Sequence, residues 1–124
     1  MRKLLLATFF VAAAFTLAPA QGQEIQNMGR APSEPNGIGR LDARVVDEAG
    51  NPVKGVRLRL ESQRTDGYFC ESWNTTDDRG VAVLPPLHMG KLRLIVKAKG
   101  YEDQKLDINP ASLNEPVRIT LVKD

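Results

Sequence analysis

The feature that most constrains this chain is an alternation of apolar and polar residues, repeated in short segments from about residue 41 to the C-terminus. The segments 56–61 and 91–97 show it most clearly. Because successive side chains of a strand point to opposite faces, this period of two predicts half-buried β-strands. Turn residues separate the segments, as at 77–80, where Gly80 is expected to adopt a positive φ.

Seven strands are expected along the chain. They are predicted at about 41–46, 56–61, 68–75, 81–84, 91–97, 106–108 and 117–121. No helical stretch lies between them, whereas parallel strands need long crossover connections that are usually helices. The spacing therefore predicts an all-β fold, a seven-stranded antiparallel Greek-key sandwich whose two sheets bury their apolar faces against each other. We place this domain at residues 39–124.

The first twenty residues have the features of a signal peptide. Met1–Lys3 is positively charged, Leu4–Leu17 is apolar, and Ala18–Ala20 has the small residues that a signal peptidase recognises. The fourteen residues of the apolar run would span only about 21 Å as a helix, against a hydrocarbon core of roughly 30 Å. We therefore expect cleavage after Ala20, a secreted or periplasmic protein, and no membrane span after cleavage.

Residues 21–38 are predicted to be a disordered leader between the signal peptide and the domain. The segment contains two prolines, three glycines and no apolar periodicity. Such a composition is typical of a flexible linker, because it offers no apolar face that could be buried against a sheet.

The overall charge limits the classes of partner. Removing Arg2 and Lys3 with the signal peptide leaves 15 of the 17 basic residues, which equals the 15 acidic residues. A mature chain without net charge is not a general binder of polyanions, so no nucleic acid partner is expected. Cys70 is the only cysteine, so no disulfide can form within the chain, and we expect its thiol to pack as a small apolar group.

No group of residues predicts a metal site, a cofactor or a catalytic centre. His88 is the only histidine, and one histidine without further cysteines cannot form a zinc site of the usual composition. Asp66, Asp77 and Asp78 lack the Asp-x-Asp-x-Asp-Gly spacing of a calcium loop. A role in turns is expected instead, with Asp77 accepting hydrogen bonds from backbone N–H groups.

Outward basic residues are the first candidate binding surface. In common Ig-like sandwiches the first, second and fifth strands share a sheet. Alternation then places six basic and two acidic side chains on one outer face: Arg44, Arg57, Arg59, Lys91, Arg93, Lys97, Asp42 and Glu61. Such a face fits an anionic glycan, an acidic protein or a charged lipid head group. The alternative is that these residues only solvate the sheet and prevent aggregation.

Three aromatic residues are the second candidate. Along a strand, Phe69 and Trp73 share one face, while Tyr68 and Cys70 share the other. The pattern leaves open which pair faces the core. Core packing of the aromatic residues is the expectation, and an outward pair would form a platform for a sugar ring or a protein partner.

Motifs in three regions, at 43–56, 75–90 and 92–101, follow one another along the predicted strands. The segment 43–56 contains Val-x-Asp and then Gly-x-Pro-Val-x-Gly, and the segment 75–80 is a Thr-Thr-Asp-Asp-Arg-Gly turn. Leu-Pro-Pro-Leu and Gly90 follow at 84–90, then the strand 92–96 and a closing Lys-Gly-Tyr at 99–101. In this order the motifs resemble the carboxypeptidase regulatory-like domain family, over about Gly39 to Val122.

The resemblance implies a transthyretin-like sandwich, also described as a carbohydrate-binding-like fold, which usually acts as an accessory or adhesion module. Hydroxyisourate hydrolases share the transthyretin-like fold, but they need several histidines and a Tyr-Arg-Gly-Ser tail, and this chain ends in Leu-Val-Lys-Asp. We therefore expect no enzyme activity. The expected function is an exported, non-catalytic binding or interaction module that recognises a protein or a glycan. The alternative is a structural subunit that docks onto a secreted or cell-envelope assembly.

Overall fold

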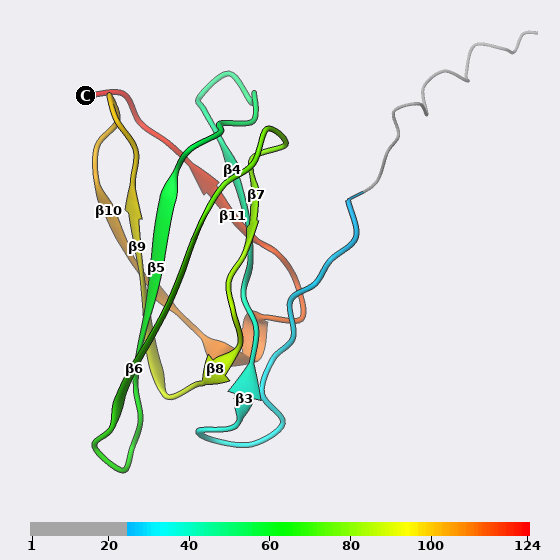
Figure 1. Cartoon of the computed structure of the whole chain (residues 1–124), viewed down its shortest axis with the longest axis vertical. Coiled ribbons are helices and arrows are strands. Elements are labelled where there is room, and N and C mark those ends of the chain that lie inside the picture. The colour runs from blue at the N-terminus through cyan, green and yellow to red at the C-terminus, as the bar shows by residue number, and fades with distance from the viewer. Residues whose placement is uncertain (1–24) are drawn as a thin grey trace, which may run out of the picture.

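The alternating segments form the strands of two facing sheets in the computed structural model, which describes residues 25–124 (Figure 1). One sheet has four strands, in the order β10 (Gln104–Ile108), β9 (Lys91–Lys97), β5 (Arg57–Gln63) and β6 (Phe69–Thr75). The other has three, in the order β11 (Val117–Thr120), β4 (Asp42–Val46) and β7 (Val81–Val83). Two short strands, β3 (Ile38–Gly39) and β8 (Leu87–His88), pair with each other. Within these described residues, no helix has the length and hydropathy needed to cross a membrane.

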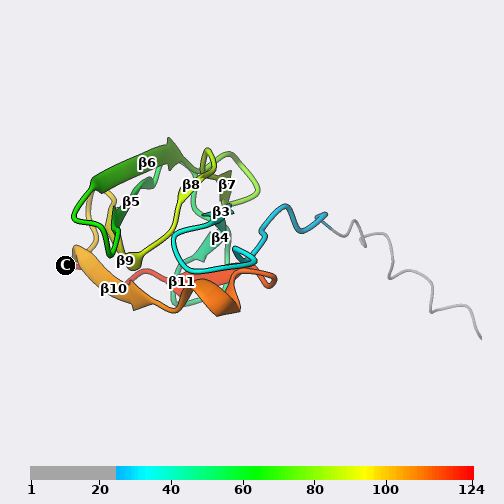
Figure 2. The ribbon, with the colours of Figure 1, turned by 90° about the horizontal axis from the view of Figure 1, so that it is seen from below.

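The all-β sandwich is confirmed, with one exception to its antiparallel pairing. Figure 2 shows the two layers end-on, with the chain passing from one to the other. β11 runs parallel to β4, with Val117 opposite Ala43 and Thr120 opposite Val46. The reason is the connection from β10 to β11, which crosses between the sheets through a 3₁₀ turn at Pro110–Ser112 and does not reverse the chain as a hairpin would. The β3–β8 pair was not predicted, because two residues are too few to show alternation.

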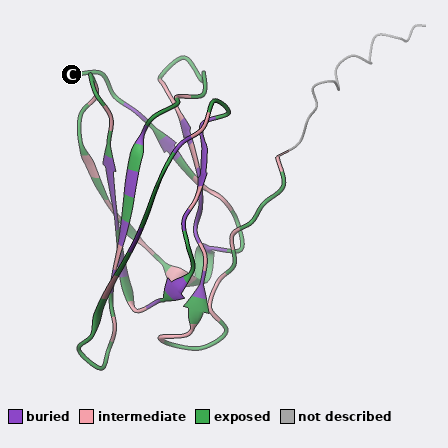
Figure 3. Cartoon of the chain, in the orientation of Figure 1, coloured by how far each residue is buried: buried purple, intermediate pink, exposed green. Residues whose placement is uncertain are grey.

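The core lies between the sheets and is aliphatic. Buried and exposed residues alternate along β5 and through most of β9 (Figure 3). Leu58, Leu60 and Leu94 of the four-stranded sheet form one cluster with Val45 and Ile119 of the three-stranded sheet, and each is at most 2% exposed. Burying a side chain of this size stabilises the fold by about 1.5–3 kcal/mol.

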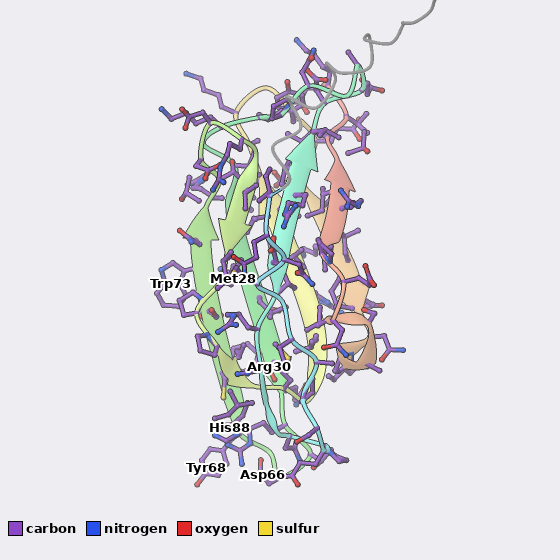
Figure 4. The ribbon with its side chains drawn as sticks, turned by 90° about the vertical axis from the view of Figure 1, so that its right-hand side faces the viewer. Met28, Arg30, Asp66, Tyr68, Trp73 and His88 are labelled. Atoms are coloured by element: carbon purple, nitrogen blue, oxygen red, sulfur yellow. The ribbon has the colours of Figure 1, made fainter. Side chains whose placement is uncertain are left out.

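Residues 25–37 form an N-terminal strap along the outer side of the three-stranded sheet (Figure 4). Arg30 and Arg40 exchange two backbone hydrogen bonds of 2.9 Å, and the N–H of Ala31 donates to Asn114 Oδ1 at 2.9 Å. The prediction of a disordered leader is therefore wrong for residues 25–38. Polar groups of the strap backbone find partners on the domain, which an apolar pattern cannot reveal. Residues 21–24 and the predicted signal peptide with its cleavage site lie outside the described residues.

The strap covers an ion pair on β4. Asp42 accepts from Arg44 Nε at 2.7 Å, from Arg44 Nη2 at 2.9 Å and from the N–H of Met28 at 2.8 Å. The Asp42 side chain is fully buried, and that of Arg44 is 12% exposed. Burial alone raises the pKa of Asp42, but the hydrogen bonds from Arg44 and Met28, together with the charge of Arg118, outweigh it and lower the pKa below its usual value.

Arg44 therefore does not belong to the predicted basic face. β4 lies in the three-stranded sheet, whereas β5 and β9 lie in the other, so the first, second and fifth predicted strands do not share a sheet. The expectation taken from Ig-like sandwiches is wrong on this point, and Asp42 and Arg44 stabilise the attachment of the strap instead.

Candidate functional site

The outer face of the four-stranded sheet brings together most of the predicted site residues. β5 pairs with β6 on one side and with β9 on the other, so outward side chains form rows across the sheet. There are four rows across these three strands: Thr75–Arg57–Lys97, Trp73–Arg59–Ile95, Glu71–Glu61–Arg93 and Phe69–Gln63–Lys91. These twelve side chains are termed the β6–β5–β9 face. Every predicted site residue except Arg44 lies on it.

Three aromatic side chains project from β6 and the turn before it. Tyr68, Phe69 and Trp73 are 68%, 56% and 64% exposed, and Figure 4 shows Tyr68 and Trp73 pointing away from the ribbon. The expectation that they pack in the core is wrong. β6 is an edge strand whose inward side lies against the chain after β7, where Ser72 Oγ donates to the Pro85 carbonyl oxygen at 2.6 Å. Only small side chains fit between segments that approach so closely, so the large ones point outward.

Two shallow hollows in this face lie beside the aromatic residues. The larger, the Trp73 hollow, has a volume of about 340 Å³, and its lining includes Trp73, Ile95, Thr75, Arg57, Arg59 and Lys97. The smaller, the Phe69 hollow, has a volume of about 160 Å³, and its lining includes Phe69, Lys91, Arg93, Glu61 and Asp107. Trp73 and Phe69 stand four residues apart on β6, which corresponds to about 13 Å along the strand.

Acidic residues in the row between Trp73 and Phe69, two of which also line the Phe69 hollow, neutralise part of the basic charge. Arg59 Nη2 lies 3.2 Å from Glu61 Oε2, and Arg59 Nε lies 3.8 Å from Glu71 Oε2. Arg93 Nε lies 3.9 Å from Asp107 Oδ1 of β10. All these side chains are partly exposed, and ion pairs of this kind contribute at most about 1 kcal/mol each to stability.

Other basic residues of the face have no carboxylate partner or only a loosely held one, so their charge can interact with a ligand. Within residues 25–124, no carboxylate lies within ion-pair distance of Arg57 or Lys91. Lys97 Nζ lies 3.9 Å from Asp103 Oδ2, and both side chains are more than half exposed. The excess of basic residues is smaller than predicted, because Glu71 and Asp107 join this outer face. The remaining positive charge is concentrated around the Trp73 hollow.

The strands and turn motifs of this chain are matched by a known family model. The carboxypeptidase regulatory-like domain matches residues 40–122, from the start of β4 to the end of β11 and slightly beyond. The chain belongs to this family. Carboxypeptidase regulatory-like domains are non-catalytic β-sandwich modules. A search of curated proteins gives no match to the chain. The strap at 25–37 lies outside the matched region.

In this carboxypeptidase regulatory-like domain, two of the three aspartates considered as metal ligands, Asp66 and Asp77, stabilise turns. Asp77 Oδ1 accepts from the N–H groups of Arg79 and Val81 at 2.9 and 3.1 Å, and its Oδ2 accepts from Arg79 Nη2 at 2.9 Å. The hydrogen bond from the Arg79 side chain is the main cause that lowers the pKa of Asp77. Asp66 Oδ1 accepts from the N–H of Tyr68. Across the part of the chain that the structure describes, no three His, Cys, Asp or Glu residues gather as a metal site.

Cys70 and His88, the other two side chains with reactive groups, both contact neighbouring parts of the fold. Cys70 is half-buried and packs against the core cluster, as expected for a small apolar group. His88 is exposed, and its Nδ1 lies 2.9 Å from the carbonyl oxygen of Asn36 in the strap. This contact links the strap to the short strand β8, so His88 has a structural role.

Two acidic residues on the outer side of the four-stranded sheet, Glu71 and Asp107, were not predicted, although the sequence carries a signal for one of them. Glu71 stands between Phe69 and Trp73 in the two-residue period of a strand, so it must share their face. Asp107 could be placed only through the strand order, because β10 lies beside β9 and sets Asp107 opposite Arg93. Alternation reveals which residues share a face and leaves the neighbouring strand undetermined.

Proposed function

We propose that this chain is an exported, non-catalytic binding module whose β6–β5–β9 face binds a partner outside the cytoplasm. The observation that carries the proposal is the position of the aromatic residues. Residues 25–124 contain four of them, and three, Tyr68, Phe69 and Trp73, are exposed on β6 and its preceding turn. Exposed apolar area costs about 25 cal/mol per Å² relative to burial. Two of the three, Phe69 and Trp73, lie on the β6–β5–β9 face, and exposed aromatic side chains that share one face are typical of binding surfaces.

The sheet beneath these residues supports a binding role. β5 pairs over its whole length with both β6 and β9, so the side chains of the face stand on a backbone that is held from both sides. Trp73 has only two side-chain torsions to restrict. A surface prepared in this way loses little conformational entropy when it binds, which improves affinity for a given contact area.

Replacing Trp73 by serine is expected to reduce binding by about tenfold or more, because tryptophan is among the residues that contribute most to the binding energy of a surface. The parent protein and the variant are immobilised and exposed to extracellular fluid and envelope extract of the cells that make it. Retained protein and retained carbohydrate are then measured separately.

The matched control for this experiment is Ile38→Ser. Ile38 is also a large exposed apolar residue, at 53%, but it lies on β3, away from the β6–β5–β9 face. Retention should not change in this variant. Equal retention by the parent and by the Trp73→Ser variant would contradict the proposal. Retention of envelope protein alone would support the alternative of a docking subunit.

The proposal that the protein is exported rests on residues 1–20, whose charge, apolar run and small residues resemble a signal peptide. We expect the mature protein to begin at or near Gln21. Mass spectrometry of the intact protein from the exported fraction measures its N-terminus. An intact Met1 in that fraction would show that the segment is not removed.

A further inference from the structure

The Trp73 hollow combines three cationic side chains with little opposing charge. Arg57, Arg59 and Lys97 line it, and no carboxylate is part of its lining. Arg59 shares its charge with Glu61 and Glu71. Arg57 is without a carboxylate partner among residues 25–124, and Lys97 has a distant, exposed one. A ligand group at this hollow would therefore meet a local positive potential, which favours a carboxylate or a sulfate.

The same hollow has an apolar side and a polar rim. Trp73 presents an exposed indole, and Ile95, only 6% exposed, lies in the same row on the other side of Arg59. Thr75, Arg57 and Arg59 also line the hollow and supply polar groups beside the indole. A sugar ring has apolar C–H groups on its faces and hydroxyl groups at its edges, so it matches an aromatic platform with hydrogen-bonding groups around it.

The acidic row next to the hollow limits the kind of polymer that fits. Glu61 and Glu71 lie between Trp73 and Phe69, and Asp107 lies at the end of the same row. A polyanion with a charge at every unit, such as a nucleic acid strand with one charge per ~3.4 Å, would place negative charge directly over these carboxylates. A polymer with charges farther apart can place neutral units there.

The surroundings of Trp73 also favour a glycan over an apolar protein surface. The centres of protein interfaces are depleted in Lys, Glu and Asp. On this face Glu71 stands between Phe69 and Trp73 on β6, Glu61 lies opposite Glu71, and Lys91 and Lys97 stand at the β9 end of their rows. A flat apolar protein surface would have to desolvate these charges without pairing them, which costs free energy. A hydrated glycan can leave them in contact with water.

We propose that the β6–β5–β9 face binds a linear acidic polysaccharide in which neutral sugars separate the charged ones. One charged sugar lies on Trp73, with its carboxylate between Arg57 and Lys97. Neutral sugars cross the row of Glu61 and Glu71 toward the Phe69 hollow, about 13 Å along β6. This proposal rests on the proposed function and specifies its ligand.

The single tryptophan of the chain provides the measurement, because Trp73 emission reports only on this site. The mature protein is titrated with a hyaluronan hexasaccharide, in which uronate alternates with a neutral sugar. A galacturonate oligomer of equal length, charged at every sugar, and neutral cellohexaose serve as comparisons. We expect a saturable change of emission with the alternating oligomer, and at least about tenfold weaker binding of the other two. The affinity should fall as salt is raised.

The Arg57→Gln variant keeps the fluorescent reporter and removes one cation. We expect it to weaken binding of the alternating oligomer by about tenfold or more, because the variant loses a charge-assisted hydrogen bond to the carboxylate of the sugar. The matched control is Arg118→Gln, an exposed arginine on β11 in the other sheet, which should leave the affinity unchanged.

Several outcomes would overturn the proposal. Equal or tighter binding of the galacturonate oligomer would show that spaced charge is not required. Tighter binding of cellohexaose, or unchanged affinity in the Arg57→Gln variant, would exclude a role for the acidic group. No emission change with any oligosaccharide, while Trp73→Ser still abolishes retention of a protein, would reject the glycan and leave the proposed function standing.

Discussion

Replacing Asp42 by alanine is expected to lower the free energy of unfolding by about 3–5 kcal/mol, as is typical when one partner of a buried ion pair is removed. The Arg44 guanidinium would be left with little access to water, since it is only 12% exposed. The N–H of Met28 would also lose its acceptor, which weakens the attachment of the strap. Urea unfolding of the parent and the variant measures the difference.

Two variants identify the cause of this loss. Arg79→Ala removes the cation of an exposed pair, with Asp77, and should cost less than about 1 kcal/mol. The double variant Asp42→Leu/Arg44→Leu replaces the buried pair by apolar side chains and should be more stable than Asp42→Ala, because no unpaired charge remains. If Asp42→Ala costs no more than Arg79→Ala, the strap does not bury this pair in solution.

The pH dependence of stability gives a second readout of the same pair. The pKa of Asp42 is lowered in the folded protein, below the value of about 3.9 expected for an unfolded chain. The ionised carboxylate therefore stabilises the fold above about pH 4, and this contribution is lost as the pH falls through the folded-state pKa. Asp42→Asn should show a shallower loss of stability in acid. Asp77, whose pKa is also lowered, is present in both proteins, so the difference reports on Asp42.

Replacing Gly80 by alanine is expected to destabilise the protein by about 2–4 kcal/mol, the sum of a backbone penalty and a steric one. Its φ of +75° lies in the region that residues with a Cβ rarely adopt. An added Cβ would also lie 2.4 Å from the carbonyl oxygen of Val45, in the backbone of β4. The turn cannot move away easily, because the N–H of Val45 donates to the Gly80 carbonyl oxygen at 2.8 Å.

Gly50→Ala is the matched control for this substitution. Gly50 has a φ of +88°, and a Cβ added there would have no atom within 4 Å. Only the backbone penalty applies, so the cost should be about 1 kcal/mol. Thermal or urea unfolding of both variants gives the comparison. Equal costs at the two positions would show that the Gly80 turn can move away from β4 without an additional loss of stability.

Much of the fold could be predicted because its signals are local. The seven main strands agree with the alternating segments to within a few residues, and the turn at Gly80 has the positive φ expected from its sequence. The aromatic residues show the limit of such signals. That Phe69 and Trp73 share a face follows from their spacing, but that this face points to solvent depends on how closely β6 approaches the chain near Pro85.

The sequence by itself determined the class of fold, the positions of the strands and the family. The signals for these, a period of two and the turn residues, depend only on residues that are close together in the chain. Only the tertiary structure decided that β4 and β5 lie in different sheets and that residues 25–37 cover Asp42. It also decided that Glu71 and Asp107 stand beside Arg59 and Arg93. These choices depend on pairing between distant segments, whose free energy comes from total burial and from hydrogen bonds across the sheets. A local pattern of apolar residues is compatible with several such pairings, so it cannot select one.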